Sequence, residues 1–267
     1  MENYRTPEKL NQRISIHEKY SVNRQGFGNW IFSHYALREN LRILECGCGT
    51  GDIWKNHIDD IPKGCSLTLT DASEGMVADV RERFSGCHFI DCALADIQEL
   101  PYEDNSYDIV IANAMLYHVP DINRELREAR RVLREGGVFY ASTYGEHGML
   151  DVLIQWLPEI PLQEKRNLRF TLQNGERQIK EVFSDVVRHD YEDALAVTSV
   201  HDIVDYIYSL PSASDLSESY YDQIARALSD RMENGVLMIP KEYGLFVASW
   251  ADEEMVGGLM DRPITTL

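Results

Sequence analysis

The stretch LECGCGTGD, residues Leu44–Asp52, follows a short apolar run and places a glycine at positions 47, 49 and 51. A glycine-rich turn between a strand and the next helix lets the backbone approach a ligand closely, because no side chain intervenes. The stretch therefore predicts a strand, a ligand-binding turn and a helix at this point of the chain.

The sequence around this turn alternates apolar strands with amphipathic helices. Strands are predicted for LRILEC, SLTLTD, CHFIDC, YDIVIAN and GVFYAST, and helices for MVADVRERF and INRELREARRVL, the second of which Gly136–Gly137 would end. Two more strands are predicted for VVRHDYEDALAV and YGLFVASW, with the helical stretches VHDIVDYIYSL and YYDQIARALSDRM between them. This alternation is typical of a doubly wound α/β sheet with helices on both faces. YGLFVASW is too distant for a hairpin but fits an added antiparallel strand.

The 267 residues suffice for one large α/β domain with an appended lobe. We expect four segments. Residues 1–40 form an N-terminal helical segment, interrupted around Asn23–Asn29, and residues 41–148 form the core of the sheet. Residues 149–182, which contain the prolines of LPEIPLQ, form a helical insertion after the fifth strand. Residues 183–267 supply the strands and helices that complete the sheet.

Composition excludes several classes of partner. The 26 basic and 44 acidic residues give a net charge of −18, which would repel a nucleic-acid backbone. No run approaches the roughly 18 apolar residues of a membrane span, and the polar N-terminus does not resemble a signal peptide. We therefore expect a cytoplasmic protein without nucleic-acid or membrane partners, either a monomer or a homodimer.

Five cysteines, an odd number, fit reduced thiols in a reducing compartment. Cys46 and Cys48 lie inside the glycine turn, and no second pair stands at a spacing suited to a metal. Small apolar side chains also fit a tight turn. We therefore predict no metal site.

The acidic residues of the turn bear on the choice of ligand. A dinucleotide fingerprint, G-x-G-x-x-G, would place its third glycine at Asp52, and Glu45 adds a second carboxylate. Two carboxylates oppose a pyrophosphate, so the turn favours a nucleoside-like, cationic ligand without phosphates. S-adenosylmethionine has these properties, and a nicotinamide dinucleotide is the alternative.

Two further acidic residues suit the rest of such a ligand. Asp71 ends the second predicted strand, twenty residues after Gly51, where a carboxylate can accept two hydrogen bonds from a ribose diol. Its alternative role is to cap the following turn, DASEG. Asp96, in the loop after the third strand, can accept a hydrogen bond from the adenine amino group while Ile97 packs on the ring.

Together these segments resemble a known family. LECGCGTGD, the terminal Asp71, ADIQELPYEDNSYDIVIANAMLYHVPD and EARRVLREGGVFYAST resemble, in order, the motifs of class I S-adenosylmethionine-dependent methyltransferases. They are most similar to the type 11 branch, which includes ubiquinone and menaquinone biosynthesis enzymes. The resemblance covers about residues 41–145. It implies a Rossmann-like, seven-stranded sheet with an antiparallel last strand, S-adenosylmethionine as cofactor and S-adenosylhomocysteine as product.

The resemblance also implies roles for particular residues. Glu45, Gly47, Gly49 and Gly51 would surround the methionine moiety and Asn113 would line the sulfonium side. Asp71 would bind the ribose, and Asp96 and Ile97 the adenine. Ala72 and Met76, which follow Asp71, are also predicted to contact the cofactor.

Candidate catalytic residues lie at the carboxyl ends of the fourth and fifth strands. Methyl transfer is an in-line displacement that mainly requires alignment and exclusion of water, so a general base is optional. The candidates are Tyr117 and His118 after the fourth strand and Glu146 and His147 after the fifth. His118 is the first choice as a base, and its alternative is a packed histidine bonded to a backbone carbonyl.

The N-terminal stretch HEKYSVNRQGFGNW mixes aromatic residues with glycines, as a lid can. Tyr20 and Trp30 would then cover the methionine end of the cofactor, or Trp30 would only dock a helix on the core. We predict a methyltransferase with a small-molecule acceptor bound between the N-terminal helices and residues 149–182. The acceptor atom, whether oxygen, nitrogen or carbon, stays open. The alternatives are a protein methyltransferase and a non-catalytic sensor of the cofactor.

Overall fold

The structure is a computed structural model that describes residues 15–162, 168–210, 213 and 215–250. Its internal contacts divide the chain into two compact units. Unit 1 comprises residues 1–30, 144–168 and 190–244, and unit 2 comprises residues 31–143, 169–189 and 245–267. The predicted insertion, 149–182, is therefore shared between the two units. Residues 1–14 of the predicted N-terminal segment lie outside the described residues.

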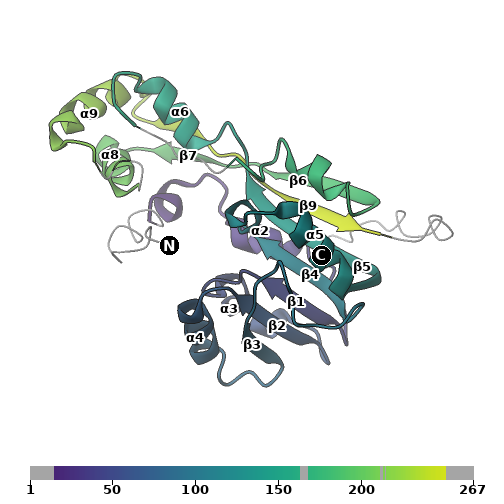
Figure 1. The fold of residues 1–267 in the computed structure, drawn as a ribbon. Coiled ribbons are helices and arrows are strands. Elements are labelled where there is room, and N and C mark those ends of the chain that lie inside the picture. The colour runs from purple at the N-terminus through teal and green to yellow at the C-terminus, as the bar shows by residue number, and fades with distance from the viewer. Residues whose placement is uncertain (1–14, 163–167, 211–212, 214, 251–267) are drawn as a thin grey trace. The chain divides into compact units, whose positions relative to one another are not determined.

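A seven-stranded sheet with the order β3-β2-β1-β4-β5-β9-β6 organises unit 2 (Figure 1). The pairs from β3 through β5 are all parallel, and β9, the last strand, is antiparallel. This confirms the predicted α/β sheet. The strands are β1 (Arg42–Cys46), β2 (Ser66–Asp71), β3 (Ile90–Leu94), β4 (Tyr107–Asn113), β5 (Leu133–Tyr144), β6 (Asp185–Tyr191) and β9 (Tyr243–Ser249).

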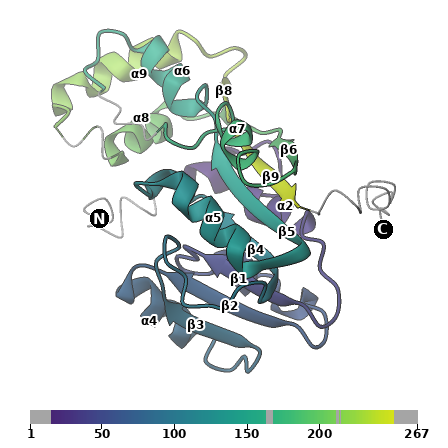
Figure 2. The same ribbon diagram turned by 45° about the vertical axis from the view of Figure 1, so that its right-hand side comes forward.

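Helices cover the sheet because successive side chains of a buried strand point to opposite faces. In β1, Leu44 and Cys46 pack in one cluster with residues of α5, the helix that crosses one face of the sheet in Figure 2. Glu45, between them, faces the other way and meets α3. The bounds are α2 (Phe27–Ser33), which leads from unit 1 into unit 2, α3 (Asp52–Lys55), α4 (Glu74–Arg83), α5 (Ile122–Val132), α7 (Gly175–Ile179), and the 3₁₀ helices η1 (Ile58–Asp60) and η2 (Leu116–His118).

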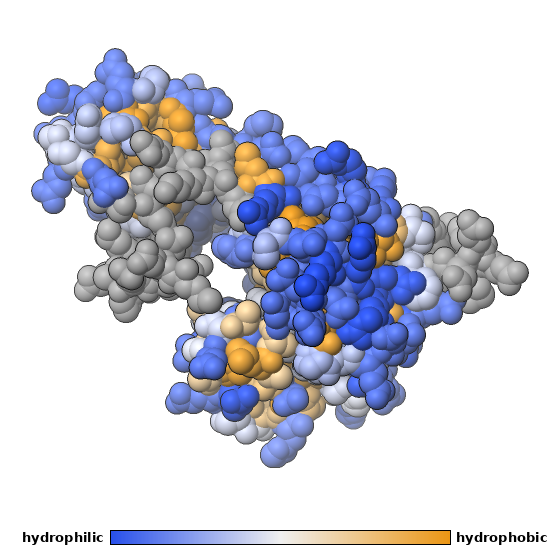
Figure 3. Space-filling view, in the orientation of Figure 1, coloured by the Kyte–Doolittle hydropathy of each residue, from blue (hydrophilic) through white to orange (hydrophobic). Residues whose placement is uncertain are grey.

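Unit 1 is a smaller assembly of helices around two paired strands. β7 (Ala194–Val197) pairs with β8 (Leu237–Pro240) in antiparallel register, with Leu195 opposite Ile239. Figure 3 shows apolar residues gathered among α6, α8 and α9, where a second buried cluster forms the core of this unit. The helices are residues 15–20, α6 (Met149–Trp156), α8 (Val200–Ser209), η4 (Glu218–Tyr220) and α9 (Tyr221–Ser229). No helix of the described ranges is long and apolar enough to cross a membrane.

Three predicted elements differ in the structure. α5 ends at Val132, before the two glycines, and β5 begins at the next residue, Leu133. The glycines therefore lie inside β5, where the pairing of β4 with β5 is irregular and Gly136 has a φ of 70°. The predicted strand CHFIDC lies three residues further on, as β3. The predicted strand VVRHDYEDALAV is two strands, β6 and β7, which belong to different sheets. β8 was not predicted.

Candidate functional site

The glycine turn follows β1 directly. Gly47, Gly49 and Gly51 have φ values of 65°, 54° and 67°, in the left-handed region that side chains disfavour. A Cβ at Gly47 would lie 2.9 Å from Met115, and one at Gly51 would lie 2.8 Å from Phe84. A Cβ at Gly49 would meet nothing within 4 Å. Packing therefore requires the first and third glycines, while the second leaves space open.

A pocket of about 260 Å³ lies over this turn. It brings together five of the residues predicted to bind the cofactor, namely Glu45, Gly47, Gly49, Gly51 and Asn113. The sequence interpretation had not assigned the other lining residues to the ligand, which are Cys48, Thr50, Asp52 and Ile53.

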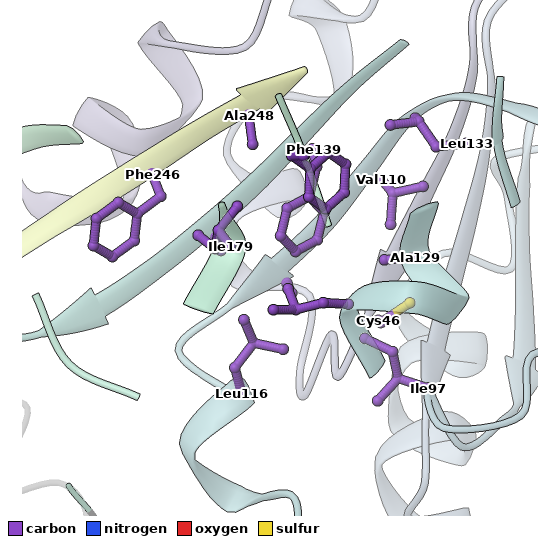
Figure 4. Close-up of a cluster of buried hydrophobic side chains, with 14 of the residues drawn as sticks. Cys46, Ile97, Val110, Leu116, Ala129, Leu133, Phe139, Ile179, Phe246 and Ala248 are labelled. Atoms are coloured by element: carbon purple, nitrogen blue, oxygen red, sulfur yellow. The ribbon is translucent and has the colours of Figure 1, made fainter. Parts of the chain in front are cut away.

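The apolar cluster that supports the pocket lies between the strands and the covering helices (Figure 4). Cys46, at the end of β1, and Leu116, in η2, are both fully buried in it. Ile97 packs in the same cluster, which fixes the loop that carries Asp96. The three loops that follow β1, β3 and β4 thus rest on one rigid base.

Glu45 is a buried carboxyl at the wall of the pocket. Only 3% of it is exposed, its Oε2 accepts a hydrogen bond from Trp54 Nε1, and its Oε1 accepts one of 2.9 Å from Asn113 Nδ2. Burial raises the pKa of Glu45 to about 7, although both hydrogen bonds work in the opposite direction. The charge of Asp71 adds to the upward shift. Glu45 is therefore poised to gain or lose a proton near neutral pH.

Asn113 links Glu45 to the segment before β1. Its Nδ2 also donates a hydrogen bond of 2.7 Å to the hydroxyl of Tyr35, which stacks on Trp54 at 5.8 Å between ring centroids. The other amide atom, Oδ1, is buried and has no hydrogen-bond partner among the described residues. A buried carbonyl oxygen without a donor is costly, so this atom marks a place where a ligand donor would be stabilised.

Asp71 ties the end of β2 to the glycine turn. Its Oδ2 accepts a hydrogen bond of 3.0 Å from the Gly49 backbone N–H, and its Oδ1 accepts one of 2.8 Å from that of Ser73. The second bond is the turn-capping contact that the sequence offered as the alternative role. Ala72 is exposed beside it, and Met76 lies in the first turn of α4, where its N–H donates to Ser73 Oγ.

The remaining predicted residues of unit 2 lie outside the lining of the pocket. Asp96 is exposed and accepts a hydrogen bond of 2.9 Å from the Gln98 N–H. Tyr117 and His118 lie in η2, with ring centroids 4.5 Å apart. Partial burial lowers the pKa of His118, which keeps its ring neutral at pH 7.

Four predicted residues belong to unit 1. The Tyr20 hydroxyl donates a hydrogen bond of 2.6 Å to Asp202, and Trp30 stacks on Phe27. Glu146 and His147 follow β5, and the His147 N–H donates to Glu242 Oε2 at 2.6 Å. The lid role of the first pair and the catalytic role of the second stay predictions.

Two residues that hold Glu45 in place, Trp54 directly and Tyr35 through Asn113, were missed in the sequence. Trp54 is fully buried and comes three residues after Gly51, so a large aromatic side chain at the start of the helix was the available signal. Tyr35 lies eleven residues before Cys46, outside any motif, and carried no signal. Among the described residues, no cluster of His, Cys, Asp and Glu could hold a metal ion, and burial raises the pKa of Cys46 to about 12.

Comparisons with known proteins agree with this geometry. Residues 44–141 match the family model of the methyltransferase domain. Demethylmenaquinone methyltransferase from Staphylococcus aureus is 32% identical over 132 residues, which are 49% of this chain and 52% of that protein. The chain thus spans about half the length of the curated relatives it matches.

Solved structures share the fold at low sequence identity. A Bacillus halodurans protein with a provisional methyltransferase assignment has a TM-score of 0.61 at 17% identity, over 85% of this chain and 99% of that one. Phosphoethanolamine N-methyltransferase 2 from Haemonchus contortus, in complex with S-adenosyl-L-methionine, has a TM-score of 0.56 at 18% identity, over 92% of this chain and 58% of that one. The family match confirms the predicted resemblance, in that residues 44–141 are similar to methyltransferase domains of the class I, type 11 kind, and the solved structures agree in fold.

Proposed function

We propose that this protein transfers a methyl group from S-adenosylmethionine to a small-molecule acceptor. The observation that carries the proposal is the pocket over the glycine turn, where open backbone, the buried carboxyl of Glu45 and the unpartnered Oδ1 of Asn113 meet. The two oxygen-bearing groups suit a ligand with a cationic hydrogen-bond donor. The open backbone of the turn leaves room for the rest of that ligand.

The residues present fit S-adenosylmethionine group by group. Its ammonium can donate to Asn113 Oδ1 and to the Glu45 carboxylate, and such a charge-assisted bond would replace the missing donor. The space at Gly49 accommodates the chain of the methionine moiety. Asp71, at the end of β2, is the acceptor for the ribose diol, and Asp96 and Ile97 remain the proposed contacts of adenine.

A dinucleotide fits this turn less well. A pyrophosphate needs the N–H groups and dipole of a following helix, and α3 has only four residues. Asp52 occupies its first turn, where Arg83 and Thr50 already bind the carboxylate. The Arg83 guanidinium therefore balances Asp52 and is not directed to a phosphate.

The cofactor supplies a methyl group on a sulfonium, which an acceptor displaces in line. The chain contributes alignment and exclusion of water, which the rigid base under the three loops supports. A base is needed only for an acceptor that must lose a proton. His118, neutral and close to the end of β4, is the residue of unit 2 that we assign to this role if the acceptor requires it.

Of the possible methyl acceptors, the comparisons favour a small molecule. The Staphylococcus aureus relative is named for demethylmenaquinone, a small molecule. The family match ends at residue 141, before the segment 149–182 that we propose as part of the acceptor pocket. The acceptor therefore does not carry over from the relative. Labelled methyl in proteins would favour a protein methyltransferase, and tight binding without transfer would favour a sensor.

Replacing Asp71 by alanine is expected to weaken binding of S-adenosylhomocysteine by about 2 kcal/mol, or roughly 30-fold, because charge-assisted hydrogen bonds to the ribose are lost. Isothermal titration calorimetry measures the change directly. Asp79→Ala removes an exposed carboxylate from α4 and serves as the matched control, with no change expected. An unchanged dissociation constant for Asp71→Ala would show that the ribose is held elsewhere.

Affinity for S-adenosylhomocysteine is expected to rise as the pH increases from 6 to 8. The pKa of Glu45 is about 7 in the free protein, and a bound ammonium favours the ionised carboxylate, so binding lowers this pKa and releases a proton. The rise should level off once Glu45 is ionised before binding. Calorimetry across this pH range should show the slope in the wild type and a flatter curve in Glu45→Gln. Equal slopes would remove Glu45 from the ammonium contact.

A further inference from the structure

The side-chain amide of Asn113 is held by two partners in unit 2. Its Nδ2 donates hydrogen bonds to Glu45 Oε1, at 2.9 Å, and to the Tyr35 hydroxyl, at 2.7 Å. Both N–H groups of the amide are therefore used, and Oδ1, buried and without a partner among the described residues, is the acceptor that Asn113 offers to the pocket. This orientation suits an ionised Glu45, because a carboxylate only accepts hydrogen bonds.

Uptake of a proton by Glu45 would disturb this arrangement. Its Oε2 already accepts a hydrogen bond from Trp54 Nε1, so the favourable place for the proton is Oε1, the atom bonded to Asn113. Two donors then face each other, the O–H of Glu45 and the N–H of Asn113, and their hydrogen bond is lost. Only 3% of Glu45 is exposed, so the loss is costly.

A half-turn of the Asn113 amide restores the lost bond. The two ends of an amide are nearly alike in shape, so the reversal exchanges Oδ1 and Nδ2 without displacing their neighbours. Oδ1 has two lone pairs, and it can then accept from the Glu45 O–H and from the Tyr35 O–H, because a phenol donates as well as accepts. The separations of 2.9 and 2.7 Å fit such bonds. Tyr35 thus serves both orientations of the amide.

Other titratable groups near Glu45 keep their charge around neutral pH. Burial raises the pKa of the Tyr35 hydroxyl and of the Cys48 thiol, so both stay protonated. Burial opposes ionisation of Asp52 as well, but the hydrogen bonds to its carboxylate outweigh this effect and lower its pKa. The charge of Asp71, at the end of β2, favours the protonated form of Glu45. Glu45, whose pKa burial raises to about 7, therefore changes its charge while the first three groups keep theirs.

We propose that the Asn113 amide reverses when Glu45 takes up a proton, and that this reversal changes the wall of the pocket from a cation acceptor to a hydrogen-bond donor. With Glu45 ionised, the wall offers Oδ1 and a negative charge, which suit a ligand ammonium. With Glu45 protonated, it offers the two N–H groups of Asn113 and no charge, which suit a carbonyl or carboxylate oxygen and oppose an ammonium. Asn113 is thus a specificity-determining residue. Its action on the ammonium of S-adenosylmethionine rests on the function proposed above.

Nuclear magnetic resonance of the free, full chain observes the reversal without any ligand. The NH2 protons of Asn113 lie next to the Tyr35 hydroxyl in one orientation and turn away from it in the other. We expect a nuclear Overhauser cross-peak between these protons and the ring protons beside the Tyr35 hydroxyl at pH 8.5, and its loss at pH 5.5. A cross-peak of equal strength at both pH values would overturn the inference.

Glu45→Gln imitates the protonated acid at every pH. The carbonyl oxygen of the new side chain accepts from Trp54, and its NH2 group donates to Asn113 Oδ1, so the cross-peak should be absent at both pH values. Glu181→Gln is the matched control, because Glu181 is an exposed carboxylate that accepts from Asn123 Nδ2 at 2.9 Å. It should keep the wild-type behaviour. A cross-peak retained in Glu45→Gln would contradict the reversal, and the wild-type spectra decide the matter if this variant does not fold.

Two ligands test the consequence for binding. S-Adenosylhomocysteine carries the ammonium, whereas its deamino analogue keeps the carboxylate and lacks the ammonium. Between pH 8.5 and 5.5, calorimetry on the wild type should show S-adenosylhomocysteine weakening about tenfold or more and the analogue changing less than about twofold. Equal pH dependence of the two ligands would overturn the inference.

The two kinds of measurement separate this inference from the proposed function. S-Adenosylhomocysteine binding with a cross-peak that does not change with pH would overturn the inference and leave the proposed function standing. A cross-peak that changes as expected, with no S-adenosylhomocysteine binding at either pH, would support the reversal of the amide and overturn the proposed function.

Discussion

Replacing Trp54 by alanine is expected to lower the free energy of unfolding by about 3–5 kcal/mol. Trp54 is fully buried in unit 2, where it stacks on Tyr35 and meets the edge of Phe32 at 6.0 Å between ring centroids. Removing this side chain would leave a cavity between α3 and the strand that carries Glu45. Urea unfolding of the two proteins at pH 7 measures the loss.

The same substitution has a second effect through Glu45. Trp54 Nε1 donates a hydrogen bond to Glu45 Oε2, and this bond stabilises the ionised carboxylate. Without it, the pKa of Glu45 should rise further. We therefore expect weaker binding of S-adenosylhomocysteine at pH 7. Trp54→Phe keeps most of the packing and removes only the donor, so it should cost about 1–3 kcal/mol of stability. A loss below 1 kcal/mol for Trp54→Ala would contradict the view that this residue anchors the turn.

Lys241→Met should cost about 3–5 kcal/mol of stability, because it leaves Asp193 as a buried charge without its cation. The Asp193 carboxylate is 0% exposed and would keep only its bonds from Ser21 Oγ, at 2.5 Å, and from backbone N–H groups. The hydrophobic stem of methionine fills most of the space of lysine. The loss therefore reports the uncompensated charge more than a cavity.

A double variant isolates this charge effect. Lys241→Met with Asp193→Asn replaces the ion pair by neutral groups, and it should recover most of the stability that Lys241→Met loses. Lys180→Met breaks an exposed pair with Glu176 in α7 and should cost no more than about 1 kcal/mol. Chemical unfolding of the four proteins provides the comparison. A double variant as unstable as Lys241→Met would show that packing, and not charge, sets the loss.

The Lys241–Asp193 pair also explains why the sequence did not predict the break between β6 and β7. YDIVIAN was predicted with the bounds of β4 because a buried parallel strand is a continuous apolar run with clear ends. VVRHDYEDALAV looked like one strand because its apolar residues continue on both sides of Asp193. Asp193 instead bonds Ser21 and Lys241, which lie 172 and 48 residues away, and the chain changes sheets there. Such distant partners leave no local pattern.

Prediction of the candidate functional site from the sequence is limited in the same way. The glycines and Glu45 could be predicted because they lie at the end of a strand of a parallel sheet, and Asn113 could be predicted from the family resemblance. Trp54 binds Glu45, and Tyr35 binds Asn113, from segments whose packing depends on the finished fold. A pocket in unit 1 is lined by Ser21 and Phe27 together with Lys241 and Tyr243. These residues are more than 200 positions apart in the sequence, so no spacing pattern could predict this pocket.

Transfer of a labelled methyl group to a small molecule is the direct test of the proposed activity. The purified protein is incubated with methyl-labelled S-adenosylmethionine and a cell metabolite extract, and the label is followed by mass spectrometry. We predict label in a small molecule, strongly reduced with Asp71→Ala and retained with Asp79→Ala. Label confined to macromolecules, or no transfer although S-adenosylhomocysteine binds tightly, would contradict a small-molecule methyltransferase.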